Sequence, residues 1–521
     1  MPAPDDDHGL RVLLLAPELL GPEPDLIGLR WTLAQSGGSL RVLARVIDGR
    51  GIAALQLTAS MPGIRLEILA AAGLALPDMA RASKVVHMPP GVGAAETDDL
   101  ALALSDVVLV AGSERDLPLA KKASGLGKPL LPPGHHVPQA EGPFPGLLDD
   151  LDADTHPVRR RVCGRSEQFA LQMLAIKWTG RWTQWKDSLT RIGRCFATGW
   201  EPVSFLGPEG WEKYVPDRDA ATPDAPIVAR FALFDRCAVY GAYVHRDCIW
   251  AINALAVVAV FAAVIGAIWG PPHGHASTLV ELVALLAIGG LVLTMPRFDL
   301  HPRWTASRMA AEQSRVARLC VPLLVAPEAL LTKDGPVPSG WRSNYTWLAL
   351  DGVKRSVRRQ GLPRIAGMLT PRQAAEWLQL IVIDQIGYHH RNAATLTRAE
   401  HCLEIIVATM FLATFGVVLA HFKFDAHWML LVTAGGPALA AASHGAKTQL
   451  GFVHRIALSE ETVLSLDVIA KELEALLGKE QADTAEYWSK LRGLAVSAAQ
   501  VMGQENLSWH HLLQRERASL P

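Results

Sequence analysis

The sequence predicts an α/β domain with a parallel sheet, followed by an all-α region with four transmembrane helices and further C-terminal helices. Three observations predict this fold class. Short apolar runs alternate with helical patterns in residues 1–145, two apolar hairpins lie within residues 249–296 and 403–444, and amphipathic patterns fill the tail. Each hairpin holds two apolar runs close to the roughly 20 residues that a helix needs to cross the hydrocarbon core of a bilayer.

The N-terminal region has the alternation of a Rossmann-like domain. Leu10 to Ala16, Leu40 to Val46 and Val107 to Val110 are apolar runs of strand length. The clearest unit is SDVVLVAGSERDLPLAKKASGLGKPLLPP, in which a strand, a glycine turn, a helix and a second strand follow one another. These runs predict parallel strands that are joined by helices.

Between the two hairpins lies a polar, arginine-rich helical block, residues 297–402. Lys and Arg concentrate on the cytoplasmic side of membrane proteins, and the turn GPPHGHAS of the first hairpin carries no formal charge. This bias predicts that the block and both termini are cytoplasmic, although Lys423 weakens the contrast for the second hairpin. A Trp-rich helical connector is expected in residues 146–248, and helices suited to self-association in residues 445–521.

Charge and cysteine content limit the classes of protein. The 50 Lys and Arg residues balance 51 Asp and Glu residues, so the net charge of −1 gives no electrostatic footprint for nucleic acid. The six cysteines form no C-x-x-C pair, which favours free thiols in a reducing cytoplasm. The start MPAPDDDHG lacks the basic and then apolar order of a secretory signal. We therefore expect a multi-pass membrane protein with its polar regions in the cytoplasm.

The first candidate ligand loop follows the run that ends at Val110. Gly112, Ser113 and Glu114 stand where a helix N-terminus presents free N–H groups to an anion, at the carboxyl edge of a parallel sheet. An ordinary helix cap explains Ser113 equally well.

The second candidate ligand loop is MPPGVGAAETDD. Gly91 and Gly93 allow a ligand to approach the backbone, and Glu96 is placed for a hydroxyl group, while a plain surface loop is the alternative. Paired histidines occur three times, but no carboxylate or thiol lies at ligand spacing from them. The sequence predicts no metal site.

Polar residues inside the apolar runs are candidates for a pore. Glu281 is costly in hydrocarbon unless it faces protein or water, and because it lies near the outer end of its run, contact with headgroups is the alternative. Asn253 and Thr409 can line a path or hold helices together. Pro437, in the sequence GGP, predicts a kink in the fourth span, either static or a hinge.

A coupling helix is expected just before the second hairpin. Asp384 and Tyr388 lie four positions apart and so share a helix face, with Gln385 and Asn392 nearby. This helix could transmit a shift from the cytoplasmic domain to the membrane. Simple packing is the alternative.

Three stretches together resemble the SLATT class, the SMODS and SLOG-associated two-transmembrane effector domains. They are HPRWTASRMAAEQSRVARLCVP, DQIGYHHRNA and VMGQENLSWHHLLQRE, and the resemblance covers Val228 to Pro521. The N-terminal region is more loosely similar to the SLOG superfamily of Rossmann-like domains through the SDVVLVAG unit. It departs from that family where LLLAPELLGPEPD replaces the glycine-rich phosphate loop.

This resemblance implies an effector of an anti-phage conflict system in a bacterial inner membrane. The cytoplasmic domain would bind a small nucleotide-derived signal, and the membrane part, as a homo-oligomer, would breach the bilayer; no resident cofactor is expected. The alternative is a membrane-tethered enzyme that cleaves the N-glycosidic bond of a nucleotide or NAD, with Glu96 or Glu114 as the catalytic carboxylate. A scaffold that only assembles partners is a third reading.

Overall fold

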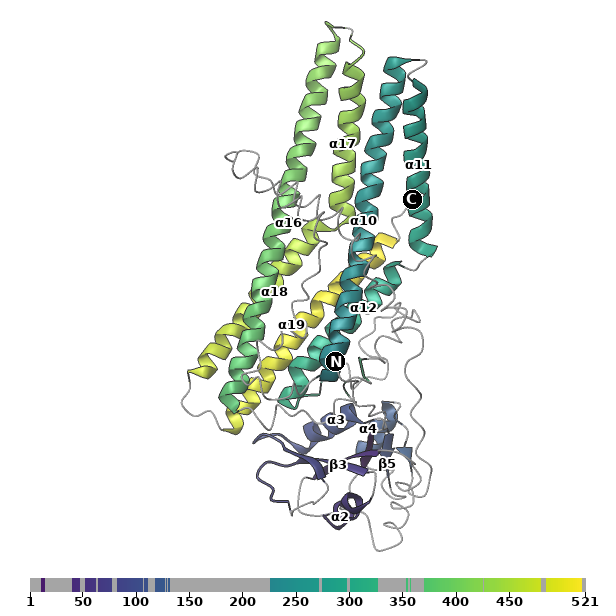
Figure 1. Ribbon diagram of the computed structural model, residues 1–521. Helices are drawn as coiled ribbons and strands as arrows, with labels where there is room; N and C mark the ends of the chain where they lie inside the picture. The colour runs from purple at the N-terminus through teal and green to yellow at the C-terminus, as the bar shows by residue number, and fades with distance from the viewer. Residues whose placement is uncertain are drawn as a thin grey trace.

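The sheet lies at one end of the molecule, and long helices run from it to the opposite end (Figure 1). The computed structural model describes residues 11–14, 40–46, 52–61, 64–76, 82–105, 107–110, 118–126, 128, 130–131, 225–270, 274–297, 300–326, 353–354, 357, 370–424, 426–478 and 484–517. The predicted helix in the Trp-rich connector and the loop with Gly112, Ser113 and Glu114 lie outside these residues.

The predicted parallel sheet is confirmed. Its strands are β1 (Arg11–Leu14), β2 (Leu40–Val46), β3 (Ile64–Ala70), β4 (Ala82–His87), β5 (Val107–Leu109) and β6 (Leu130–Leu131). Their order is β4-β3-β2-β1-β5-β6, and every neighbouring pair is parallel. The order reverses between β1 and β5, because β2 to β4 extend to one side of β1 while β5 and β6 extend to the other.

Helices cover both faces of this sheet. They are α2 (Ile52–Ser60), α3 (Ala94–Leu104) and α4 (Pro118–Gly125). Figure 1 shows α3 on the side of the sheet toward the long helices and α2 on the far side. Two buried apolar clusters, one centred on Leu43 and Leu100 and the other on Leu55 and Ile68, form the core of the sheet domain, residues 11–131. Burial on both faces is what doubly covered parallel strands require.

The rest of the described chain is helical. Its elements are α10 (Ala225–Trp269), α11 (Gly274–Arg297), α12 (Leu300–Cys320), the 3₁₀ turn η3 (Val321–Leu323), α16 (Pro371–His421), α17 (Met429–Gln449), α18 (Phe452–Leu477) and α19 (Ala485–Arg517). We call the segments 249–269, 274–297, 405–421 and 429–449 the apolar layer. The remaining parts of these helices form the helical base.

Three helices are long and apolar enough to cross a membrane: Cys237–Trp269, Gly274–Arg297 and Pro371–His421. The predicted fourth span, on α17, is not among them in the described part of the chain, since threonine, glycine, proline, serine and histidine interrupt its apolar residues. α17 is continuous to Gln449 with Pro437 inside it, so the helix is not broken there, and the expected kink at Pro437 stays a prediction.

The four helices of the apolar layer form an open row. α17 packs between α16 and α10, and α11 packs on the opposite side of α10. Glycines permit the close approach: a Cβ on Gly435 would meet the ring of Phe261 at 2.6 Å, and one on Gly436 would meet the hydroxyl of Thr414 at 2.5 Å. Small residues at such contacts let helix backbones come together.

Two helices run without a break from the base into the apolar layer. α10 starts at Ala225, and α16 starts at Pro371 behind a capping box in which Thr370 and Gln373 exchange side-chain and backbone hydrogen bonds. Their lower halves belong to the core of the base, where Phe231, Trp377 and Leu491 are buried together. The base and the apolar layer are therefore joined by two continuous helices, with no loop between them.

Candidate functional site

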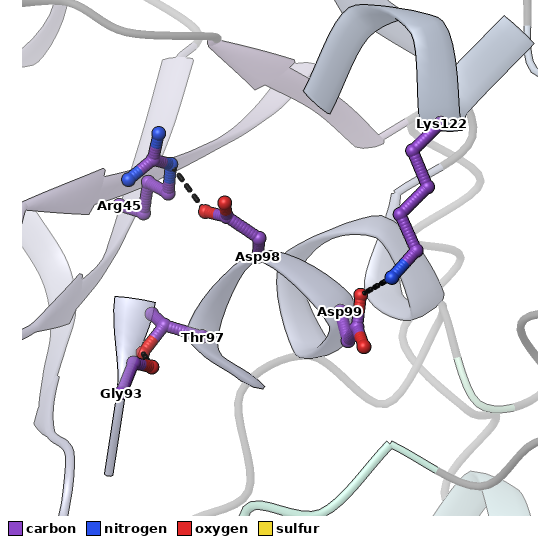
Figure 2. A network of polar contacts seen from close by, with 6 residues as sticks. All are labelled: Arg45, Gly93, Thr97, Asp98, Asp99 and Lys122. Carbon is purple, nitrogen blue, oxygen red and sulfur yellow. Dashed lines mark hydrogen bonds and ion pairs between the residues drawn. The ribbon is translucent and has the colours of Figure 1, made fainter. Parts of the chain in front are cut away.

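The first turns of α3 are tied to the sheet by a polar network (Figure 2). Arg45, near the carboxyl end of β2, forms an ion pair of 2.6 Å with Asp98, and Lys122 of α4 pairs with Asp99. The hydroxyl of Thr97 donates to the carbonyl of Gly93 at 3.0 Å. Asp98 and Asp99 thus hold α3 between β2 and α4.

The loop that follows β4 lies against α19. Gly91 has φ +84°, and a Cβ there would stand 2.8 Å from the Cβ of Ala485, so only glycine fits without a shift. Gly93 is exposed, with open space around it. The close approach predicted for a ligand at Gly91 is made instead by a helix of the base. A ligand role for Gly91 and Gly93 stays a prediction.

Glu96 points to the same helix. Its carboxylate accepts from Arg492 of α19 at 2.5 Å, and a second nitrogen of Arg492 donates to the carbonyl of Leu324 at 3.0 Å. Arg492 is nearly buried, whereas the side chain of Glu96 is 56% exposed. One guanidinium therefore joins the sheet domain, the end of η3 and α19, and we call this contact the Arg492 clasp.

The clasp lies on a continuous apolar interface. Ala317, Val321 and Leu324, at the end of α12 and in η3, belong to the same buried cluster as Leu100 and Leu104 of α3. The sheet domain is thus packed directly on the helical base. α12 follows α11, a helix of the apolar layer, after a short connection in the chain. The length of α12 therefore separates this interface from the apolar layer.

Leu324 is strained. Its φ of 57° makes it the single non-glycine residue with positive φ in the described part of the chain. The left-handed conformation is unfavourable by about 1–2 kcal/mol for a residue with a Cβ. Burial of its side chain and the bond from Arg492 hold it there. Next to it, burial raises the pKa of the Cys320 thiol to about 12.

The AEQSRVAR part of the first resemblance stretch, residues 311–318 on α12, contributes to an ion cluster around a buried carboxylate. Glu312, almost fully buried, pairs with Arg308 at 2.8 Å and with Arg315 at 2.6 Å. The guanidinium groups of Arg315 and Arg318 lie over the ring of Phe231 on α10. These contacts hold α12 against α10, and packing accounts for the residues of this motif.

The residues of the expected coupling helix lie on α16 in the base. Asn392 donates to the hydroxyl of Ser459 on α18 at 2.9 Å, and Gln385 is buried. Asp384 is partly exposed, while the ring of Tyr388 is exposed and meets His389 edge-on. Gln385 and Asn392, seven positions apart, thus face inward, and Tyr388 faces outward.

A polar cluster marks the lower boundary of the apolar layer. The amide of Asn253 on α10 donates to Gln449 on α17 at 3.1 Å. Lys447 on α17 pairs with Glu400 at 2.8 Å and with Glu404 at 2.7 Å on α16. These contacts join the three helices at one height, and a role of Asn253 in lining a path stays a prediction.

Aromatic side chains mark the upper boundary. Trp269 ends α10, and Phe422, Phe424 and Trp428 surround the turn between α16 and α17; all four are more than half exposed. From Asn253 to Trp269, and from Lys447 to Trp428, the helices rise by about 24 Å and about 28 Å. These lengths are close to the hydrocarbon thickness of a bilayer, roughly 30 Å.

The structure places Glu281 deeper than the sequence suggested. Gly266 of α10 contacts Ser277 of α11, so Glu281, four residues further, is level with Ala262. It then lies about 10 Å below Trp269 and about 13 Å above the polar cluster. Thr409 on α16 and Pro437 on α17, the other pore candidates, are both exposed.

Comparisons with protein-family models, with curated proteins and with solved structures found no match. Among the described residues, no group of three His, Cys, Asp or Glu side chains is placed to hold a metal ion. The likeness to SLOG and SLATT domains therefore stays a prediction. Sequence reasoning missed Arg492 and Leu324, because one is a common tail residue and the other contributes a backbone carbonyl.

Proposed function

We propose that the apolar layer lies in a membrane and that all four of its helices span it, α17 included. The contacts from Asn253 to Gln449 and from Phe261 to Gly435 hold α17 at the same height as α10. Its upper end carries exposed Trp428, as α10 carries Trp269, and such rings favour the membrane interface. A helix of small residues suits a place between two apolar neighbours.

The base and the sheet domain then face the cytoplasm of a bacterial cell. Arg246 and Arg297 stand near the base end of the layer, whereas the opposite turns carry Lys423 as their one Lys or Arg residue in the sequence. The bias of Lys and Arg toward the cytoplasmic side supports this orientation. The proposed location is the inner membrane.

The proposed function is that of an effector which senses a small nucleotide-derived ligand and opens or disrupts the membrane. The observation that carries it is the Arg492 clasp on a shared apolar core, because it couples the sheet domain to α12 and α19, which pack on α10 and α16, the two helices that continue into the layer. The ligand would bind where the strand order reverses, at the carboxyl ends of β1 and β5. Open sheets of this type bind ligands there.

Opening requires more than one copy of the chain. An open row of four helices forms a wall with two faces and encloses no path of its own. Ligand would shift a population of closed oligomers toward an open form, by no more than its difference in affinity between the two. Moving the population from 1:99 to 99:1 takes a difference of about 10⁴-fold.

The test uses full-length protein in dye-loaded vesicles with a panel of cyclic nucleotides and ADP-ribose derivatives, and calorimetry on the same protein in detergent. We expect one ligand class to bind and to release dye. The variant Arg492→Met should bind the same ligand but show an altered concentration for half-maximal release. Arg372→Gln, on an exposed ion pair of the base, is the matched control. A ligand that binds tightly and releases no dye would refute the proposal.

A further inference from the structure

Glu281 is the one formally charged side chain in the interior of the apolar layer. Residues 249–269, 405–420 and 429–446 contain no Asp, Glu, Lys or Arg, and residues 274–296 contain Glu281 alone. Its height, level with Ala262, is nearly midway between the polar cluster and the aromatic tips. A carboxylate at that depth marks a functional site by default, since burial in hydrocarbon is strongly unfavourable.

The orientation of Glu281 differs from that of the lipid-facing leucines. Glu281 is four positions after Ser277 and three positions before Ala284, so the three residues share one face of α11. Ser277 contacts α10 and Ala284 is buried, so this face of α11 packs on α10. The neighbouring Leu282 and Leu286 are more than half exposed. At the height of Glu281, α10 has the small residue Ala262, which is buried.

No protein group within the described residues neutralises this charge. Glu281 has no hydrogen bond or ion pair to any of them. A second copy of the chain cannot supply a cationic side chain either, because the layer of that copy has the same sequence and holds only another Glu281 at this height. The remaining partners are a proton or a small cation that enters from water.

We infer that Glu281 is a binding site for a small cation, a proton or an alkali metal ion, in the middle of the membrane. The inference rests on the membrane location given under the proposed function. No bond other than that to the bound proton or ion is made or broken.

The experiment measures the reaction of Glu281 with dicyclohexylcarbodiimide, an apolar reagent that attacks protonated carboxyl groups shielded from water. Full-length protein is placed in vesicles of phosphatidylethanolamine and phosphatidylglycerol in choline buffer, and adducts are located by mass spectrometry. Glu461, exposed on α18 in the base, is the internal comparison. We expect Glu281 to react at least tenfold faster than Glu461, with no adduct at position 281 in Glu281→Gln.

Labelling in buffers of different cations and pH distinguishes the two ions. Slower labelling of Glu281 in Na⁺ or K⁺ than in choline assigns an alkali metal ion, and labelling that depends on pH alone assigns a proton; either result supports the site. Labelling of Glu281 no faster than that of Glu461 overturns it, since the carboxylate then lies in water or among headgroups. The measurement needs no nucleotide. A protein that labels at Glu281 and never leaks would refute the sensing function and keep the cation site.

Discussion

The Arg492 clasp makes a quantitative prediction about how the sheet domain is held. The guanidinium satisfies the buried carbonyl of Leu324, and loss of a partner for such a group destabilises by about 1–3 kcal/mol. Its ion pair with Glu96 contributes only about 0.2–1 kcal/mol, because the carboxylate is 56% exposed and screened by water. Arg492→Met should therefore weaken docking by about 2 kcal/mol or more, and Glu96→Gln by less than about 1 kcal/mol.

Hydrogen exchange on full-length protein in detergent measures this difference. A loss of about 2 kcal/mol raises the opening constant about 30-fold, since 1.4 kcal/mol is a factor of ten. Amides of α3 and of the first half of α19 should lose protection together in Arg492→Met, while amides of β2 and β3 keep theirs. In Glu96→Gln the loss should stay below about fivefold. Equal losses in the two variants, or none at α3, would refute the assignment of the clasp to the Leu324 carbonyl.

Three further predictions concern single sites. Gly91→Val should destabilise docking by more than about 1–2 kcal/mol, because of its positive φ and the contact with α19, whereas Gly93→Ala should be neutral in a thermal melt. Glu312→Gln should destabilise the base by about 3 kcal/mol, since the buried Glu312 is the counter-charge of the partly buried Arg308 and Arg315, while Arg372→Gln in an exposed pair should change it by less than about 0.5 kcal/mol. Denaturant titration in detergent compares the two variants. Burial raises the pKa of the Cys320 thiol to about 12, so the stability that the neutral thiol contributes should be present below pH 9 and be lost as the pH rises from about 9 toward about 12. At pH 8, iodoacetamide should modify Cys320 only in unfolded protein. Rapid modification of the native protein would contradict the burial of this thiol.

The sequence predicted the sheet where strands had clear boundaries. Val107 to Val110 is bounded by Asp106 and Gly112, so the unit of β5, α4 and β6 could be predicted from its pattern alone. β3 and β4 were not singled out. ASKVVH is short and polar at its start, and it forms an edge strand, where the apolar signal is weakest.

The candidate site was harder to predict for a physical reason. The loop with Gly91 and Glu96 has the composition of a ligand loop, but what it meets is set by α19, whose Arg492 is 396 positions away from Glu96 in the chain. The depth of Glu281 likewise depends on the register of α10 against α11, which the Gly266 contact fixes. Composition gives the type of a residue, whereas its partner follows only from packing between distant segments.

The strained turn at Leu324 connects the clasp to the membrane helices. A left-handed leucine persists only while its surroundings favour it, and here these are a buried pocket shared with α3 and a bond from Arg492 on α19. If ligand binding moved α3, the pocket and the bond would weaken together, and the turn could relax by rotating about η3. The end of α12 would then move α10 with it, because Arg315 and Arg318 of α12 lie over the ring of Phe231 on α10. Because α10 is continuous to Trp269, a displacement of the base reaches the aromatic tip without crossing a loop.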